Sequence, residues 1–335
     1  MIQLLISRSS AKVYFVTEEK FYNKIIEELE PYIDIKQVDS VDPLAWIVYS
    51  DDYNKIIDDT HLLFVEKREE EPDKHIWYKE GKKYFIIQQE EDAWKLMNSI
   101  RLIRDLLRWQ LYCDGYCYFH GGLTNVNGIG IGFIGGKKSG KTSSILSFLR
   151  MKDVSYVTND DMTIRMDGSM EALGWPRAIG IRNDTHRYIE QLKKLGENAY
   201  GDEAHPANLY MHGNADHEYT TLYFKPKEVC RVYGHELATS TQLKYIIFPG
   251  FDDVAEPSLV QLSKDEAIAR LKKNIEEIPD KHNYFLMDFF NIPKLEEIES
   301  FACSMIESGL VTCYSLTQSL DCLEKASEFI RSLVE

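Results

Sequence analysis

The amino-acid sequence predicts an α/β domain built around a phosphate-binding loop, with a small strand-rich α+β domain in front of it. Three observations predict this fold class. Residues 135–142 (GGKKSGKT) fit the P-loop pattern G-x-x-x-x-G-K-[ST] and stand between a strand-like and a helix-like segment. Strand and helix patterns alternate after this loop, as in α/β domains. Most of the first 90 residues carry strand patterns instead.

The first 90 residues contain runs of β-branched and aromatic residues, which are typical of strands. These runs cover residues 2–6, 11–16, 46–49, 62–66, 76–78 and 84–88. Residues 18–29 are expected to form a helix, because apolar residues recur there at helical spacing and Pro31 follows. The charged run at residues 66–74 (EKREEEPDK) is expected to be a solvated loop between strands.

Residues 91–112 predict a long amphipathic helix, with apolar residues recurring on one side from Trp94 to Leu107. Asp114-Gly115 follows it directly and indicates a turn. Because the strand-rich segment stops just before this helix, we place a domain boundary near residue 90. Residues 1–90 then form the N-terminal domain, and residues 91–335 form the P-loop domain.

The strand, loop and helix around the P-loop predict where phosphate groups bind. Residues 129–134 alternate glycine with isoleucine and phenylalanine, as a strand with close backbone neighbours would, and residues 143–150 have an apolar helical face. This arrangement directs backbone N–H groups and a helix N-terminus at phosphate oxygens, which argues against a chance match. Lys141 would bridge the β- and γ-phosphates, and the Thr142 hydroxyl would bind Mg²⁺. The expected nucleotide contacts are Gly135, Gly136, Lys138, Ser139, Gly140, Lys141, Thr142 and Ser143.

Further elements are expected after the P-loop helix. Strands are predicted at residues 154–158, 162–166, 221–224, 243–248, 284–287 and 310–315. Helices are predicted at residues 186–195, 263–275, 293–307 and 319–334. Residues 173–182 have the composition of a shaped loop with short strands. Residues 197–218 are polar, contain three histidines and show no clear period, so we expect a long functional loop there.

Asp160 and Asp161 follow the strand pattern at residues 154–158, one helix after the P-loop. A β-α-β crossover would bring this position back beside the P-loop strand. Two adjacent carboxylates on an extended backbone point to different sides, so one, Asp160, could bind Mg²⁺ while the other faces a phosphate acceptor as general base. A turn or a helix cap is the alternative role of this pair. The sequence does not decide which aspartate is the base.

His120 precedes Gly121-Gly122 at the end of an apolar, aromatic stretch, where a lone histidine is ordinarily a core residue. Here it begins an ordered set that continues with residues 135–142 and ends with Asp160-Asp161. Over roughly residues 110–185, this set resembles the HPr kinase/phosphorylase family in order and spacing. The arginine- and glycine-containing segment that follows the aspartate pair in that family has its counterpart in residues 176–182, which include Arg177 and Arg182.

The resemblance implies a P-loop domain of the phosphoenolpyruvate carboxykinase type and a kinase that uses ATP, or another nucleoside triphosphate, with Mg²⁺. It implies that Asp161 or Asp160 acts as base toward a hydroxyl, with His120 next to it. Arg177 or Arg182 would contact the transferred phosphate. The N-terminal domain looks more like that of the HPr kinase homologues associated with ribosomal-peptide biosynthesis, including those similar to lasso-peptide tail kinases. The implied acceptor is therefore a Ser or Thr hydroxyl on a peptide or protein other than HPr.

The charge balance of the chain excludes some classes of partner. The 335 residues carry 39 Lys plus Arg against 54 Asp plus Glu, a formal net charge of −15, so we expect no nucleic acid and no anionic membrane as partner. The N-terminus lacks a signal-peptide pattern, and no apolar run approaches the roughly 18 residues of a membrane span. The six cysteines match no zinc spacing, which favours buried, reduced thiols in a cytoplasmic protein. A homo-oligomer stays open.

Two other hypotheses use the same loop. A small-molecule kinase would keep the site, change the acceptor and use residues 197–218 as a lid. A regulatory module without catalysis would bind the nucleotide and expose a partner surface. The sequence also leaves open the choice between ATP and GTP, and a reverse phosphorylase activity.

Overall fold

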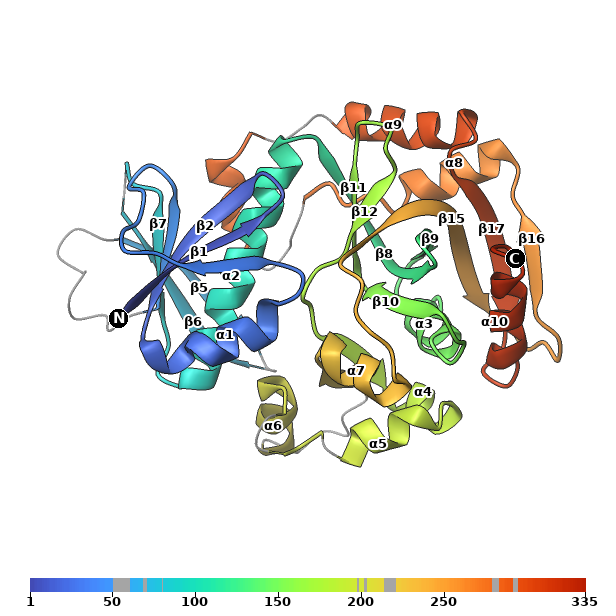
Figure 1. Ribbon diagram of the computed structural model, residues 1–335, viewed down its shortest axis with the longest axis horizontal. Helices are drawn as coiled ribbons and strands as arrows, with labels where there is room; N and C mark the ends of the chain where they lie inside the picture. The colour runs from blue at the N-terminus through green and yellow to red at the C-terminus, as the bar shows by residue number, and fades with distance from the viewer. Residues whose placement is uncertain are drawn as a thin grey trace. The chain divides into compact units, whose positions relative to one another are not determined.

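The computed structural model describes residues 1–50, 61–68, 71–79, 81–197, 199–201, 204–213, 221–278, 283–291 and 295–335. The protein is of the mixed α/β class, and the chain divides into two compact units (Figure 1). The first unit comprises Met1–Asp114, Leu209–Asp216 and Ile278–Ile292, and the second comprises Gly115–Asn208, His217–Glu277 and Pro293–Glu335. The first unit thus extends beyond residue 90 to include the long helix α2 (Asp92–Cys113), which packs against strands of that unit.

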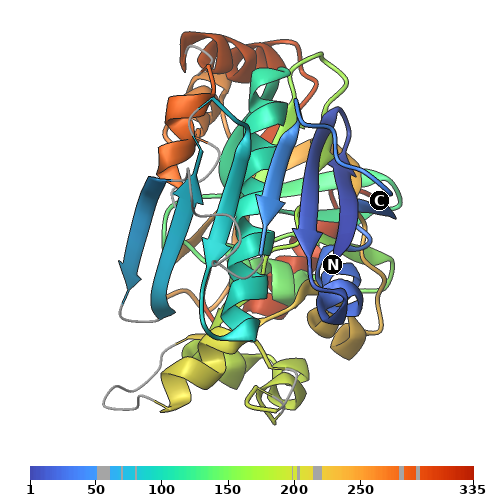
Figure 2. The ribbon, with the colours of Figure 1, turned by 90° about the vertical axis from the view of Figure 1, so that its left-hand side faces the viewer.

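The first unit is a mixed sheet in the order β3-β1-β2-β4-β7-β6-β5, with α2 lying across one face (Figure 2). Its strands are β1 (Ile2–Arg8), β2 (Ala11–Thr17), β3 (Asp34–Gln37), β4 (Trp46–Tyr49), β5 (His61–Arg68), β6 (Glu71–Tyr78) and β7 (Tyr84–Gln88). Its shorter helices are η1 (Glu19–Phe21), α1 (Tyr22–Leu29) and η4 (Tyr284–Phe289). Alternate residues of β1 and β2 are buried, because one face of the sheet packs on the core.

Two predictions for this unit are wrong. The charged run at residues 66–74 is strand over its described part: Glu66 of β5 pairs with Lys74 of β6, and the Lys74 side chain is buried. The run predicted as a strand at residues 284–287 is the 3₁₀-helix η4. Its Phe285 and Phe289 rings pack against Phe85 of β7, with centroids 5.6 and 5.4 Å away, so this apolar segment contacts the sheet through side chains and does not join it.

The second unit is built on another mixed sheet, in the order β10-β8-β11-β12-β15-β17-β16, with β9 pairing with both β8 and β15. Its strands are β8 (Tyr116–Val126), β9 (Ile129–Ile134), β10 (Val154–Thr158), β11 (Asp161–Arg165), β12 (Glu171–Leu173), β15 (Ser240–Phe251), β16 (Ser258–Gln261) and β17 (Thr312–Gln318). β13 (Ile179–Arg182) and β14 (Thr221–Phe224) form a separate pair. The helices from the P-loop onward are α3 (Lys141–Phe148), α4 (Asn183–Tyr188), α5 (Gln191–Glu197), α6 (Pro206–Gly213), α7 (Pro226–Tyr233), α8 (Lys264–Lys272), α9 (Leu295–Glu307) and α10 (Leu323–Arg331).

Helices cover both faces of the parallel part of this sheet, where β15 runs parallel to β9 and to β17. On one face, Phe133, Ile247 and Leu316 are buried against Ile145 of α3 and Ile330 of α10. On the other face, the Arg270 guanidinium of α8 donates to Ser315 Oγ at 3.0 Å and lies over the Phe248 ring. The carboxyl ends of β9, β15 and β17 therefore meet at one uncovered edge, which is where open α/β sheets bind ligands.

The crossover from the P-loop strand is wider than we predicted. β10 does not lie beside β9, because β8 lies between them and pairs antiparallel with each. Asp160 still returns to the edge at which β9 ends, since β9 and β10 both run opposite to β8.

The segment after β13 also differs from the sequence expectation. The helix predicted at residues 186–195 is broken at Ile189, which is extended and buried, into α4 and α5. The predicted long loop at residues 197–218 contains helix α6. His205 is buried beside Tyr223, with ring centroids 5.4 Å apart, whereas residues 214–220 and the side chain of His212 lie outside the described structure.

All six cysteines are free. Cys117, Cys230, Cys313 and Cys322 are buried as predicted, and burial raises the pKa of Cys230 to about 12. Cys113 is exposed, so the prediction of buried thiols is wrong there. Within the described parts of the chain, no helix combines the length and apolar character that crossing a membrane requires.

Candidate functional site

The P-loop connects the carboxyl end of β9 to the first turn of α3. Lys138 and Gly140 both have left-handed backbone conformations, with φ of 68° and 100°. A Cβ at Gly140 would also lie 2.8 Å from the Phe251 ring. Both the backbone conformation and the lack of space therefore favour glycine at this position. The first-turn N–H groups of α3 have no carbonyl partner within the helix, and the helix dipole adds positive potential at the same end. The loop is thus shaped to bind an anion.

Lys141 lies folded against this loop. Its Nζ donates to the carbonyl oxygens of Gly135 and Gly136, at 2.6 and 3.2 Å. Burial lowers the pKa of Lys141, while the negative charges of Asp160 and Glu276 oppose that shift. A desolvated ammonium that senses two carboxylates is well suited to receive a phosphate anion.

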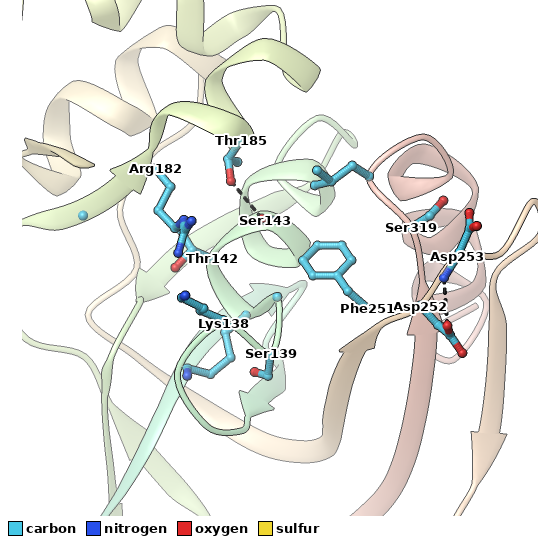
Figure 3. A pocket seen from close by; sticks show the side chains of 14 residues that line it. Lys138, Ser139, Thr142, Ser143, Arg182, Thr185, Phe251, Asp252, Asp253 and Ser319 are labelled. Carbon is cyan, nitrogen blue, oxygen red and sulfur yellow. Dashed lines mark hydrogen bonds between the residues drawn. The ribbon is translucent and has the colours of Figure 1, made fainter. Parts of the chain in front are cut away.

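A cavity of about 490 Å³ opens beside the loop, within the range of small-molecule sites (Figure 3). Residues 138–143 form its loop side, and Gly180, Arg182 and Thr185 line it from β13 and α4. Residues 251–253 and 319–320, at the carboxyl ends of β15 and β17, complete the lining. The Ser143 and Thr185 hydroxyls lie 3.1 Å apart and hydrogen-bond to each other. The cavity therefore joins the P-loop to the uncovered edge of the sheet.

The residues of the loop fit a phosphate group. The buried Ser139 Oγ has no hydrogen-bond partner among the described residues, although it lies in the lining of the cavity. A Cβ at Gly135 would lie 2.6 Å from that oxygen, so glycine keeps the hollow open. A phosphate oxygen would accept the hydrogen bond that the hydroxyl does not make within the described protein.

A Mg²⁺ ion would find suitable donors in Thr142 and Asp160. The Thr142 hydroxyl lines the cavity, and Asp160 lies at the turn between β10 and β11, close enough to affect the pKa of Lys141. Magnesium usually binds through one or two side-chain oxygens together with water and phosphate oxygens. Among the described residues, no group of three or more His, Cys, Asp and Glu side chains forms a metal site by itself.

A second group of polar side chains lies on β8 and β11. Asp161 is the register partner of His120 on these antiparallel strands, so the two side chains leave the sheet on the same face. Asp161 is 1% exposed and His120 is partly exposed. The Arg177 guanidinium donates to Asp161 Oδ1 at 2.9 Å. Two of the predicted site residues, 41 positions apart in the sequence, thus lie side by side with the predicted arginine.

Neighbouring residues hold Arg177 and its carboxylate in place. Trp175 is fully buried, and its Nε1 donates to Thr163 Oγ1 on β11 at 2.7 Å. The Arg177 backbone N–H donates to the Trp175 carbonyl at 2.8 Å. Because Trp175 is anchored to the same strand as Asp161, the ion pair has little freedom to separate.

Two residues of this region were not predicted from the sequence. Glu276 Oε1 lies 3.7 Å from His120 Nδ1, and the Glu276 backbone is tied to β8 by donation to the Tyr118 carbonyl at 2.8 Å. Asn159 is buried between β10 and Asp160, and its Oδ1 has no partner among the described residues. A glutamate after a helix and an asparagine at a turn carry no local pattern that marks them. Only the tertiary contacts bring them to the site.

The predicted residues thus fall into two adjoining groups. The P-loop residues and Arg182, which is exposed at the end of β13, line the cavity. His120, Asp161 and Arg177 lie on the β8–β11 side, outside the cavity lining. Lys141 connects the groups, because its pKa responds both to Asp160 and to Glu276.

Neither the models of known protein families nor the sequences of curated proteins match this chain.

Proposed function

We propose that this protein is a kinase that uses ATP, or another nucleoside triphosphate, with Mg²⁺ to phosphorylate a Ser or Thr hydroxyl of a peptide or protein. The observation that carries the proposal is the buried Asp161 carboxylate, paired with Arg177 and opposite His120, directly after Asp160, whose charge acts on the P-loop lysine Lys141. The order of His120, the P-loop and the aspartate pair resembles the HPr kinase/phosphorylase family. We accordingly assign the second unit to the phosphoenolpyruvate carboxykinase type of P-loop domain.

Binding of the phosphate chain follows from the loop. The β- and γ-phosphates of the nucleotide would accept hydrogen bonds from the first-turn N–H groups of α3 and from the Ser139 hydroxyl. The Lys141 ammonium would exchange two backbone carbonyls for phosphate oxygens and stay charged there. Thr142 and Asp160 would hold Mg²⁺, which neutralises charge that develops on the phosphoryl oxygens during transfer.

Transfer needs a group that deprotonates the acceptor hydroxyl. An Asp161 oxygen would take this proton, and Arg177 on Oδ1 keeps the carboxylate ionised and oriented. His120, directly across the strand pair, would position the hydroxyl, and Glu276 would orient the imidazole from its other side. Arg182, with Arg177, supplies positive charge for the transferred phosphate.

The test uses the purified full-length chain with Mg²⁺, radiolabelled ATP and short Ser-containing peptides, including any encoded beside its gene. Phosphate transfer that is lost in Lys141→Ala and in Asp161→Asn supports the proposal. Nucleotide binding without transfer to any peptide, combined with normal behaviour of Asp161→Asn in a partner-binding assay, favours a regulatory module. Transfer to a metabolite in a panel, and not to peptides, identifies a small-molecule kinase. With ATP as donor, we place the reaction in the cytoplasm.

A further inference from the structure

The cavity beside the P-loop is lined by side chains of opposite charge at its two ends. At one end it is lined by Lys138 and Arg182, and at the other by Asp252 and Asp253 (Figure 3). Lys141 also belongs to the lining. A ligand that fits this distribution is anionic at one end only. Its other end is neutral and offers N–H or O–H groups, since carboxylates accept hydrogen bonds and repel phosphate.

The acidic end also presents an aromatic ring. Phe251 is 40% exposed although its neighbours in β15 are largely buried, and its ring stands in the cavity between the P-loop and Ser319 (Figure 3). The ring lies against Gly140, since a Cβ built there would be 2.8 Å from Phe251 Cε2. A partly exposed phenylalanine ring held against the P-loop is a flat apolar surface beside the expected phosphate site.

The backbone holds this ring at the edge of the sheet. Phe251 is the last residue of β15 and pairs with Gln318, the last residue of β17. Asp252 then donates its backbone N–H to the Gln318 carbonyl at 3.0 Å, and its carboxylate accepts from the Asp253 N–H at 2.8 Å. The ring thus stands at the carboxyl end of β15, a strand with neighbours on both sides, and its backbone is held by hydrogen bonds to β17.

The position of the ring agrees with the direction of phosphate transfer. β8, with His120, flanks β9 on one side, and β15, with Phe251, flanks it on the other. A phosphate chain with its terminal group toward Asp160 and Asp161 would then extend its other end toward β15 and β17.

We propose that Phe251 is the stacking platform for the purine base of the bound nucleoside triphosphate, an assignment that rests on the proposed nucleotide binding by the P-loop. The base lies on the Phe251 ring, with its edge and the ribose hydroxyls toward Asp252 and Asp253. Base stacking on an aromatic side chain needs no hydrogen-bond match, so it suits adenine and guanine alike.

The experiment compares ligands with and without a base by calorimetry in the presence of Mg²⁺: ATP, GTP, UTP and inorganic tripolyphosphate. The wild-type chain is expected to bind ATP or GTP at least about tenfold more tightly than tripolyphosphate, and UTP less tightly than the better purine. Phe251→Ala is expected to raise the Kd of that purine nucleotide roughly tenfold or more and to leave tripolyphosphate within about twofold. The ATP and GTP arms identify the base. Leu310→Ala, which truncates another exposed apolar side chain of this unit, is the matched control and should change neither affinity.

Phe251→Trp guards against a folding defect in the alanine variant. It should restore purine affinity and gain a fluorescence change with nucleotide, but not with tripolyphosphate. Unchanged purine affinity in Phe251→Ala, with both ligands weakened in Lys141→Ala, overturns the stacking proposal and leaves phosphate binding standing. Failure of the wild-type chain to bind either ATP or tripolyphosphate overturns both proposals.

Discussion

Asp161 on β11 lies directly opposite His120 on β8, and its Oδ1 receives a hydrogen bond of 2.9 Å from Arg177. The carboxylate is almost completely buried, yet it is next to a partly exposed imidazole. Burying a charge is costly unless it is paired, and the Arg177 guanidinium is a partner for this carboxylate. The proposed mechanism would use this carboxylate as the base that takes the proton of the acceptor hydroxyl.

Asp161→Asn should abolish most of the phosphate transfer while leaving nucleotide binding intact. The amide cannot accept a proton, so we expect kcat to fall by about 10²- to 10⁴-fold with the Kd for ATP within about twofold. Asp167→Asn, which changes an exposed aspartate after the same strand, should leave kcat unchanged. Steady-state kinetics and calorimetry measure the two quantities. A kcat within about threefold of wild type would exclude Asp161 as the base.

His120 and Glu276 should act as one unit. Their side chains lie 3.7 Å apart, and the backbones on which they stand are joined by hydrogen bonds. We expect His120→Ala and Glu276→Gln each to lower kcat/KM, and the double variant to lose little more than the stronger single variant, because contacting residues are not additive. A full double-mutant cycle measures this coupling. Strictly additive effects would mean that Glu276 does not act through the histidine.

Lys141 should make nucleotide binding dependent on pH at the alkaline end. Burial lowers the pKa of Lys141 below its ordinary value of 10.5, and a bound phosphate raises it again by favouring the charged form. Below the lowered pKa the lysine is charged with or without nucleotide, so affinity does not change. Between this lowered pKa and the higher pKa that Lys141 has in the complex, binding must take up a proton, and the association constant should fall by up to about tenfold per pH unit.

Proton uptake can be measured by calorimetry in buffers that differ in ionisation enthalpy. Lys141→Arg is the control, because arginine stays charged throughout this range and should remove the uptake. Proton release in the wild-type chain would contradict the predicted direction.

Gly122→Ala should destabilise the second unit. A Cβ there would lie 2.3 Å from Ile145 Cδ1, and 2.6 and 2.8 Å from the backbone oxygens of Asn159 and Thr158. Backbone oxygens cannot move without shifting β10, so we expect a loss of roughly 1–3 kcal/mol of unfolding free energy. Gly196→Ala, whose Cβ would meet nothing closer than 3.9 Å, is the control and should not lower the melting temperature. An equal melting temperature for both variants would show that β10 can yield.

Local patterns were sufficient for many of the elements. The bounds predicted for β4, β7, β9, β10 and β14 agree with those of the structure, because strand alternation and flanking turn residues are properties of short segments. The apolar run at residues 284–287 has the same local pattern but forms η4. Its Phe285 side chain packs against the sheet of the first unit, which is built from other parts of the chain. A run of four apolar residues has no pattern that distinguishes a strand from a short helix.

The candidate site also has a part that local sequence patterns predict and a part that depends on tertiary contacts. The sequence by itself determined the P-loop pattern, because Gly135, Gly140 and Lys141 lie close together in the chain and the Lys141 side chain bonds to the backbone of the same loop. It also supplied His120, Asp161 and Arg177 as candidates. Only the tertiary structure decided that β8 separates β9 from β10, that His120 and Asp161 are register partners, and that Glu276 and Phe251 flank the loop from opposite sides. Pairing between strands depends on which distant segments bury each other's apolar faces, and no short stretch of the chain carries that information.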